Sequence, residues 1–217
     1  MPEPISDSLS YDWAEFRDHS LDSRFPEWAI GYSLWRDFSY RLESLEDFKR
    51  FQQEMARERE RRRGNGVLPK GITRVFVSHK QENRDEALRV AWIIQNKGHH
   101  FWLDVLEPTL QSNSLRPIQV AGIIEMALLN CSHVIVLITD DSVRSRWIPY
   151  EYGRAKEPTP YSLNAASWLH PAISQKIPEY LYLGVMTGSE KDIYDWLPPA
   201  LQPGPPWSGP EPPPLPR

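Results

Sequence analysis

The chain has 217 residues, which is enough for one domain with a full hydrophobic core and an additional segment. Its formal net charge of −4 excludes the strongly basic surface of a general nucleic-acid-binding protein. The single cysteine, Cys131, excludes an internal disulfide and fits a reducing compartment. The N-terminus has no secretory pattern and no apolar run approaches membrane-spanning length, so we expect a cytoplasmic protein without nucleic acid or membrane partners.

Residues 1–69 differ in composition from the rest and predict a helical N-terminal extension. Aromatic residues recur there at helical spacing, at Trp28, Tyr32, Trp35 and Phe38. The Arg/Glu run at 57–63 is interpreted as the solvated end of this helix, because Glu58 and Glu60 interrupt the positive charge. A stripe this aromatic has to be covered by the main domain, a second copy or a partner.

From residue 71 onward, strand and helix patterns alternate. Short apolar runs predict strands at 73–78, 99–103, 133–138 and 180–185. Helices are predicted from Asn83 or Asp85 to Lys97, from Pro117 through Leu128, after Ser145, and over 191–197. Prolines predict a loop over 158–178. This alternation predicts an α/β fold with a parallel sheet of four to five strands and helices on both faces.

Residues 198–217 hold about half of all the prolines and predict an extended or disordered tail. The segment Pro212–Pro216 could dock into an aromatic groove. A plain tail is the simpler interpretation, and the sequence assigns it no function.

The stretch 145–153 carries the strongest candidate chemistry. Ser145 can cap a helix, and Pro149 is tolerated in the first turn of that helix. Trp147 and Glu151 are four residues apart, so they project from one face, beyond the carboxyl end of a central strand where open α/β sheets bind ligands. The alternative is an ordinary amphipathic helix with Trp147 in the core and Glu151 on the surface.

Three predicted strands end in residues suited to bind a nucleotide. The candidate site residues are Ser78, His79, Lys80, Asp104, Trp147 and Glu151. A basic group, an aromatic ring and a carboxylate could hold phosphates, a flat base and a ribose. A carboxylate against a ribose 2′-hydroxyl can stabilise an oxocarbenium-like transition state. Nicotinamide would then depart as a neutral leaving group.

Other chemistries lack their motifs. No Walker-type or Gly-x-Gly-x-x-Gly loop follows a predicted strand, and there is no Gly-x-Ser-x-Gly sequence. The histidines lack zinc-ligand spacing, so we expect no metal. A phosphate-receiver domain would need acidic residues after the first strand, where Ser78, His79 and Lys80 stand instead.

The order of four motifs resembles the Toll/interleukin-1 receptor (TIR) domain over residues 70–197. The motifs are Arg74–His79, Phe101–Asp104, Ser132–Ile138 and Ser145–Glu151. The resemblance implies a flavodoxin-like fold. It also implies one of two activities, because adaptor and receptor members only associate, whereas enzymatic members, common in bacteria and plants, cleave NAD+ at the nicotinamide bond.

The resemblance assigns roles to the candidate residues. Glu151 stands where the enzymatic branch carries its catalytic glutamate, and Trp147 matches the aromatic residue four positions earlier. His79 and Lys80 match positions near the ligand. Asp104 matches the start of a mobile loop used in assembly, although the loop here lacks a glycine often found in it.

The implied function is that of a bacterial, Thoeris-like defence protein that converts NAD+ to ADP-ribose or to a cyclic ADP-ribose-like signal. NAD+ would be the substrate with no further cofactor. Copies would associate through TIR–TIR contacts, and the product would reach an effector protein by diffusion. Two alternatives stay open: a non-catalytic interaction module, and a nucleoside deoxyribosyltransferase that uses a glutamate as nucleophile.

Overall fold

The computed structural model describes residues 73–106, 110, 117–155, 164–200, 207 and 209–217, together with five helical positions between 46 and 57. The predicted aromatic stripe lies outside the described residues. The chain divides into two compact units, one formed by Met1–Lys70 and Asp104–Asn130 and the other by Gly71–Leu103 and Cys131–Arg217. In the described part of the chain, no helix combines the length and the apolar character that a membrane span requires.

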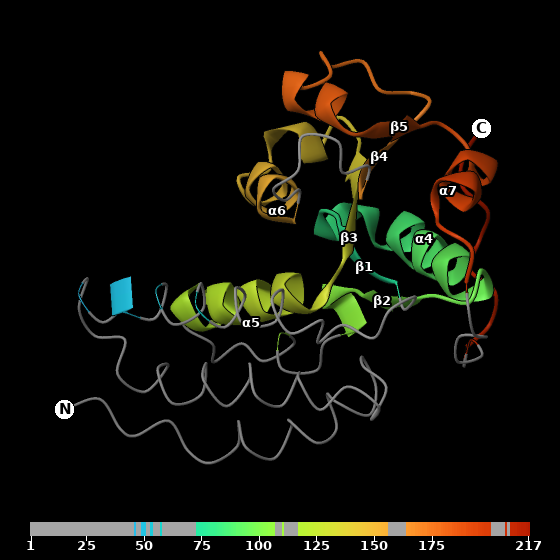
Figure 1. The fold of residues 1–217 in the computed structure, drawn as a ribbon. Coiled ribbons are helices and arrows are strands. Elements are labelled where there is room, and N and C mark those ends of the chain that lie inside the picture. The colour runs from blue at the N-terminus through green and yellow to red at the C-terminus, as the bar shows by residue number, and fades with distance from the viewer. Residues whose placement is uncertain are drawn as a thin grey trace. The chain divides into compact units, whose positions relative to one another are not determined.

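The second unit contains a five-stranded parallel sheet in the order β2-β1-β3-β4-β5 (Figure 1). The strands are β1 (Arg74–Ser78), β2 (His100–Trp102), β3 (His133–Ile138), β4 (Ala165–Leu169) and β5 (Val185–Thr187). Every pairing between neighbouring strands is parallel. This is the strand order of the flavodoxin-like doubly wound fold, which confirms the predicted fold class.

Helices cover both faces of this sheet. Figure 1 shows α4 (Arg84–Asn96) and α7 (Glu190–Trp196) on one face and α6 (Trp147–Ala155) on the other. Helix α5 (Pro117–Asn130) belongs to the first unit. Short 3-10 helices lie at Gln81–Asn83, Asp104–Leu106, Ser142–Arg144 and Glu179–Leu183.

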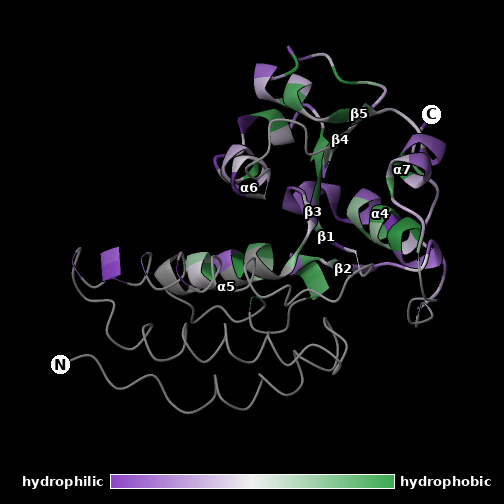
Figure 2. Cartoon of the chain, in the orientation of Figure 1, coloured by the Kyte–Doolittle hydropathy of each residue, from purple (hydrophilic) through white to green (hydrophobic). Residues whose placement is uncertain are grey.

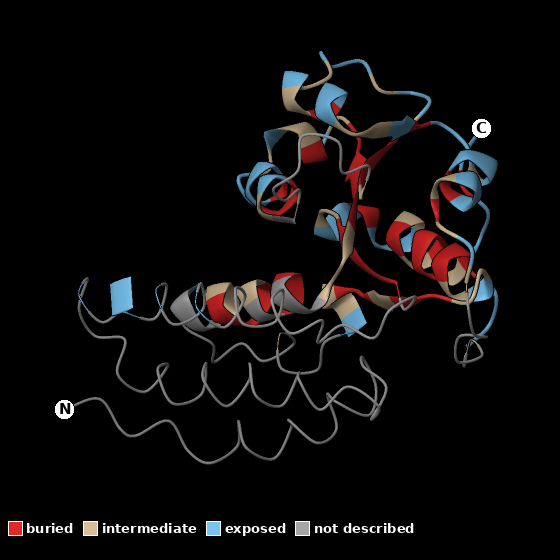
Figure 3. Ribbon diagram, in the orientation of Figure 1, coloured by how far each residue is buried: buried red, intermediate tan, exposed pale blue. Residues whose placement is uncertain are grey.

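The core of the second unit follows from its strand sequences. All five residues of β1 are buried, and so are the last five of β3 (Figure 3). The apolar residues of both strands, at 75–77 and 134–138, are consecutive rather than alternating, as expected where helices cover both faces (Figure 2). Helix α4 buries one stripe at helical spacing, formed by Ala87, Val90, Ala91 and Ile94.

The predicted end of helix α4 is confirmed. Gly98 follows the helix with a φ of 90°, the left-handed conformation that a glycine adopts without steric cost. The amide of Gly98 donates to the carbonyl of Gln95 at 2.9 Å and so satisfies one of the last helical acceptors. The chain can then turn directly into β2.

One loop prediction and one strand prediction in the last third of the chain are wrong. Strand β4 occupies residues 165–169, inside the segment predicted as a loop, because the prolines at 160 and 171 flank the strand without interrupting it. Residues 179–183 form a 3-10 helix rather than the predicted strand, and β5 begins only at Val185. A short apolar run does not by itself distinguish a strand from a helical turn.

The proline-rich end of the chain contains neither helix nor strand over residues 209–217. Whether this tail is extended or disordered, as the sequence predicts, stays a prediction. Pro212 and Leu215 within it are nevertheless buried, so this segment contacts the rest of the second unit.

Candidate functional site

The candidate site lies at the carboxyl ends of β1 and β3, the two central neighbours in the sheet. Ser78, the last residue of β1, is in register with Val136 of β3. From β1 the chain winds outward to β2, and from β3 it winds in the opposite direction to β4 and β5. The β1/β3 junction is therefore the topological switch point, and doubly wound sheets bind their ligands outside the carboxyl ends of the strands there.

Helix α6 begins close to this junction because of local hydrogen bonds that the sequence encodes. The hydroxyl of Ser145 accepts hydrogen bonds from the amides of Trp147 and Ile148, at 3.2 and 3.3 Å, which confirms the predicted N-terminal cap. Pro149 is the third helical residue, where no intrahelical amide bond is lost.

Glu151 and Ser78 form the centre of the site. The Glu151 residue is 6% exposed and Ser78 is 1% exposed. The Ser78 hydroxyl donates to Oε2 of Glu151 at 2.5 Å, across 73 positions of sequence. A hydroxyl–carboxylate bond this short is typical of a charge-assisted hydrogen bond. The sequence placed both residues at the same rim, and the structure brings them into direct contact.

Trp147 lies one turn before Glu151 and is 40% exposed. Its ring contacts that of Tyr150 edge to face, with centroids 5.8 Å apart. The core stripe of α6 consists instead of Ile148 and Tyr152, both buried. This is the reverse of the ordinary amphipathic helix, which would bury the tryptophan and expose the glutamate.

Tyr152 ties the far side of α6 to the segment that leads into β5. Its hydroxyl lies 3.5 Å from the carbonyl of Leu181, and its ring packs at 5.5 Å from that of Tyr180. Burial raises the pKa of Tyr152 to about 12, so the phenol stays protonated over the whole physiological range. Its role is therefore packing and hydrogen bonding.

His79 and Lys80 continue the chain directly from Ser78 and are both partly buried. The Lys80 ammonium lies 3.2 Å from Oε1 of Glu82. The pKa of Glu82 is lowered by its backbone hydrogen bond and then by Lys80, so the Glu82 carboxylate stays ionised at neutral pH. Asp104 begins a 3-10 helix in the first unit, whereas Ser78, His79, Lys80, Trp147 and Glu151 all belong to the second.

A second set of buried polar residues, which the sequence analysis did not identify as part of the site, surrounds the end of β3. The Thr139 hydroxyl donates to Oδ1 of Asn83 at 3.0 Å, and its amide donates to the hydroxyl of Ser142 at 2.7 Å. All three side chains are buried. Sequence position could have indicated two of these residues, because Thr139 directly follows the most apolar strand and Asn83 directly precedes a helix.

Asp140 connects this edge to the loop after β4. Its Oδ1 accepts hydrogen bonds from the amides of Ser174 and Gln175, at 2.8 and 3.0 Å, and its Oδ2 accepts one from the Ser174 hydroxyl at 2.6 Å. These bonds, led by that of the Ser174 hydroxyl, lower the pKa of Asp140. The loops after β3 and β4 are thus held together at neutral pH.

The chemistry available at this edge is that of a carboxylate, hydroxyls and aromatic rings. Among the residues that the structure describes, no group of three or more His, Cys, Asp or Glu side chains could hold a metal ion. A buried carboxylate beside a half-exposed aromatic ring can hold hydroxyl groups and stabilise positive charge.

Comparison with known families identifies a domain in the central part of the chain. Residues 75–179 match the family model described as the TIR domain. The match runs from β1 through α6 and β4 and includes both Ser78 and Glu151. No curated protein matches the chain.

Proposed function

Because residues 75–179 carry a TIR domain, we propose that the protein is an NAD+ glycohydrolase or ADP-ribosyl cyclase that uses Glu151 as its catalytic residue. The supporting observation is the buried carboxylate of Glu151, which accepts a hydrogen bond from Ser78 at the switch point of the sheet. A carboxylate in this position fits a ligand that carries hydroxyl groups and develops positive charge.

In the proposed reaction, the bond between nicotinamide and C1′ of the ribose breaks, and the electron pair leaves with the nicotinamide nitrogen. Nicotinamide departs neutral because that nitrogen is cationic in NAD+. Glu151 accepts hydrogen bonds from the ribose hydroxyls and stabilises the oxocarbenium-like transition state. In hydrolysis, water adds to C1′ and releases a proton to solvent. In cyclisation, a nucleophilic atom of the same molecule takes the place of water.

Ser78 would orient the carboxylate. A carboxylate has two oxygens and about four lone-pair directions, so one hydrogen bond from Ser78 is compatible with another from a ribose hydroxyl. Trp147, which is 40% exposed, would stack on a ring of the substrate. His79 and Lys80 would contact the phosphates or the ribose from the neighbouring strand end.

The proposal extends to assembly and signalling. TIR domains commonly self-associate, and we propose that this chain forms homo-oligomers in which a neighbouring copy completes the site. Activity would then rise more steeply than linearly with protein concentration. The product would act on a separate effector protein, in the setting of antiviral defence.

The test compares the parent chain with Glu151→Gln, which keeps the size and one acceptor oxygen of the side chain but removes the charge. Each protein is incubated with NAD+ at several protein concentrations, and the products are separated by mass. We expect nicotinamide release by the parent and a loss of at least a hundredfold in the variant. Glu179→Gln, the same substitution at an exposed glutamate in the 3-10 helix after β4, should keep parental activity. Equal release by the Glu151 variant and the parent would disprove the assignment.

One observation favours a non-catalytic interaction module as the second candidate. Trp147 and Tyr150 form an exposed aromatic pair, and such pairs are common at protein interfaces. This alternative predicts no NAD+ turnover at any protein concentration and a weaker self-association of Trp147→Ala in sedimentation. A covalent sugar adduct on Glu151 would instead indicate the nucleoside deoxyribosyltransferase chemistry.

A further inference from the structure

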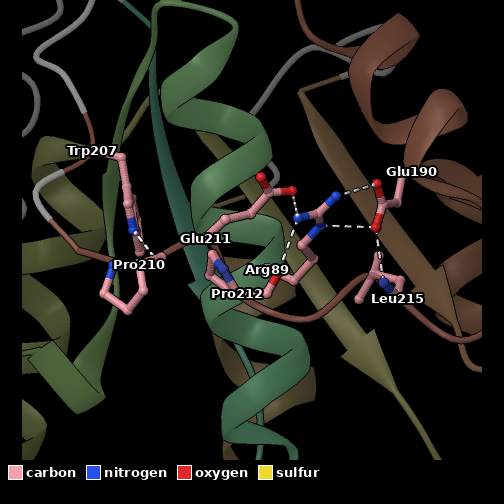
Figure 4. A network of polar contacts seen from close by, with 7 residues as sticks. All are labelled: Arg89, Glu190, Trp207, Pro210, Glu211, Pro212 and Leu215. Carbon is pink, nitrogen blue, oxygen red and sulfur yellow. Dashed lines mark hydrogen bonds and ion pairs between the residues drawn. The ribbon is translucent and has the colours of Figure 1, made fainter.

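Arg89, on helix α4, joins two parts of the chain that are distant in sequence (Figure 4). Its Nε and Nη2 donate to the two carboxylate oxygens of Glu190 on α7, at 2.8 and 3.0 Å. Its Nη1 donates to Oε1 of Glu211 at 2.6 Å and to the carbonyl of Pro212 at 2.9 Å. The Arg89 side chain is only 8% exposed. Two of these four hydrogen bonds of a buried guanidinium are therefore directed at the proline-rich tail.

The contacts with the tail segment 211–216 involve both its polar groups and its apolar side chains. Between Pro212 and Pro216, the only backbone N–H belongs to Leu215. That N–H donates to Oε1 of Glu190 at 2.8 Å. The side chains of Pro212 and Leu215 are buried, whereas Pro213 and Pro214 are exposed. One carboxylate, one carbonyl, one amide and two apolar side chains are thus recognised, which is how proline-rich peptides are selected in extended form.

A second contact holds the start of this segment. The ring of Trp207 packs against that of Phe101 on β2, with centroids 5.9 Å apart, and its indole N–H donates to the carbonyl of Pro210 at 3.0 Å (Figure 4). Further back, Nε2 of His99 lies 2.8 Å from the carbonyl of Pro198. Pro198 and Trp207 therefore both contact residues at or directly before β2.

We propose that the face formed by α4 and α7 is a binding site for an extended proline-rich peptide of the pattern Glu-Pro-Pro-Pro-Leu, and that residues 211–215 of this chain are its occupant in cis. The site pairs the guanidinium of Arg89 with a peptide carboxylate and the carboxylate of Glu190 with a peptide amide. Arg89 holds the pKa of Glu190 below its usual range, so that carboxylate stays ionised at neutral pH. A partner protein that carries the same pattern would bind by displacing the tail. None of these residues belongs to the proposed NAD+ site.

Covalent attachment determines how the two occupants compete. A short tether raises the effective concentration of the tail to the order of millimolar. A free peptide of the same sequence should therefore bind the unmodified chain weakly and bind well only when the tail's own contacts are removed. The Glu211 side chain is 61% exposed, so solvent screens its ion pair and the buried Leu215 should contribute more to binding.

The experiment uses the full chain with Glu211→Gln and Leu215→Ser in its own tail, and a fluorescent peptide with the sequence of residues 207–217. We expect saturable binding by anisotropy, at least tenfold tighter than to the parent chain. Arg89→Lys in the weakened chain should reduce binding at least tenfold, because a lysine ammonium cannot hold both Glu190 oxygens and still donate to the peptide carboxylate and carbonyl as the planar guanidinium does. Arg84→Lys, at an exposed arginine on the same helix, is the matched control and should bind normally. A peptide carrying the same two substitutions should not bind the weakened chain, which tests the site without a further change to the protein.

Hydrogen exchange examines the cis arrangement in the unmodified chain. The amide of Leu215 should exchange at least tenfold more slowly than in the isolated peptide, at a rate independent of protein concentration. Equal peptide binding by the parent and the weakened chain, or equal binding by the two arginine variants, would overturn the proposal. So would unprotected exchange of the Leu215 amide. Protection that appears only at high concentration would make a second copy, rather than the chain itself, the source of the tail.

Discussion

Replacing Ser78 with alanine tests whether the contact at the centre of the site is energetically significant. The change removes one hydroxyl from a residue that is 1% exposed and leaves the buried Glu151 carboxylate without its 2.5 Å donor. A hydrogen bond to a charged group contributes about 1.5–3 kcal/mol. We therefore expect Ser78→Ala to lower the free energy of unfolding by about 2–3 kcal/mol, measured by urea denaturation at neutral pH.

Ser167→Ala is the matched control. Ser167 is also fully buried in the sheet, on β4, but within the described part of the chain no partner lies within hydrogen-bond distance of its hydroxyl. Removing that hydroxyl should be neutral or slightly stabilising, because an unsatisfied buried hydroxyl costs free energy in the folded state. The two variants lose the same atom from similar surroundings and differ in the carboxylate partner.

A double-mutant cycle with Glu151→Gln isolates the pair. If the contact is as described, the cost of Ser78→Ala should fall by about 1–2 kcal/mol when Glu151 is already glutamine, because the charge that strengthens the bond is gone. Under the proposed function, Ser78→Ala should also lower the kcat of nicotinamide release about tenfold, since the carboxylate loses its orienting donor. A Ser78→Ala cost no greater than that of Ser167→Ala, or additive effects in the cycle, would refute the reasoning.

Three further predictions concern other parts of the same unit. Trp147→Ala should lower stability by about 1 kcal/mol or less, because the ring is 40% exposed, and under the proposed function should raise the KM for NAD+ about tenfold in steady-state assays. Burial lowers the pKa of His133 to about 4, whereas the unfolded chain binds this proton below about pH 6.5. The free energy of unfolding should therefore fall by about 1–3 kcal/mol between pH 7 and pH 4.5. His133→Asn should remove that part of the loss in urea titrations at the two pH values. Gly184→Ala would place a Cβ 2.1 Å from the Tyr152 hydroxyl and 2.5 Å from a backbone oxygen, so it should destabilise by about 2 kcal/mol or more, whereas Gly153→Ala, with no atom within 4 Å, should be stabilising by up to about 1 kcal/mol in thermal melts.

The sheet could be predicted from sequence where local signals agree. The strands at 74–78 and 133–138 are apolar, and the glycine after α4 is where the helix ends. Strand β4 could not be predicted in the same way, because Ala165, Ala166 and Ser167 have low strand propensity and prolines lie on both sides. Pairing with β3 and full burial decide its conformation, and both depend on residues distant in sequence.

At the site, too, local sequence signals predicted some features, whereas others depend on residues distant in sequence. Motif order was sufficient to place Ser78 and Glu151 at one edge of the sheet. The orientation of α6 was ambiguous, because Trp147 with Glu151 and Ile148 with Tyr152 are both stripes with a spacing of four. Only tertiary packing, which buries Ile148 and Tyr152, selects between them. The contacts of Arg89 with the tail span more than a hundred residues and have no counterpart in local sequence patterns.

The two outer strands of the sheet, β2 and β5, have only three residues each. An edge this short offers a neighbouring molecule few backbone groups to pair with, so the sheet is a poor template for continuous cross-molecular β-structure. If copies of this unit gather, they should therefore join through side chains on helices and loops. Clusters built in that way can dissociate, whereas aggregates built by strand addition resist dissolution.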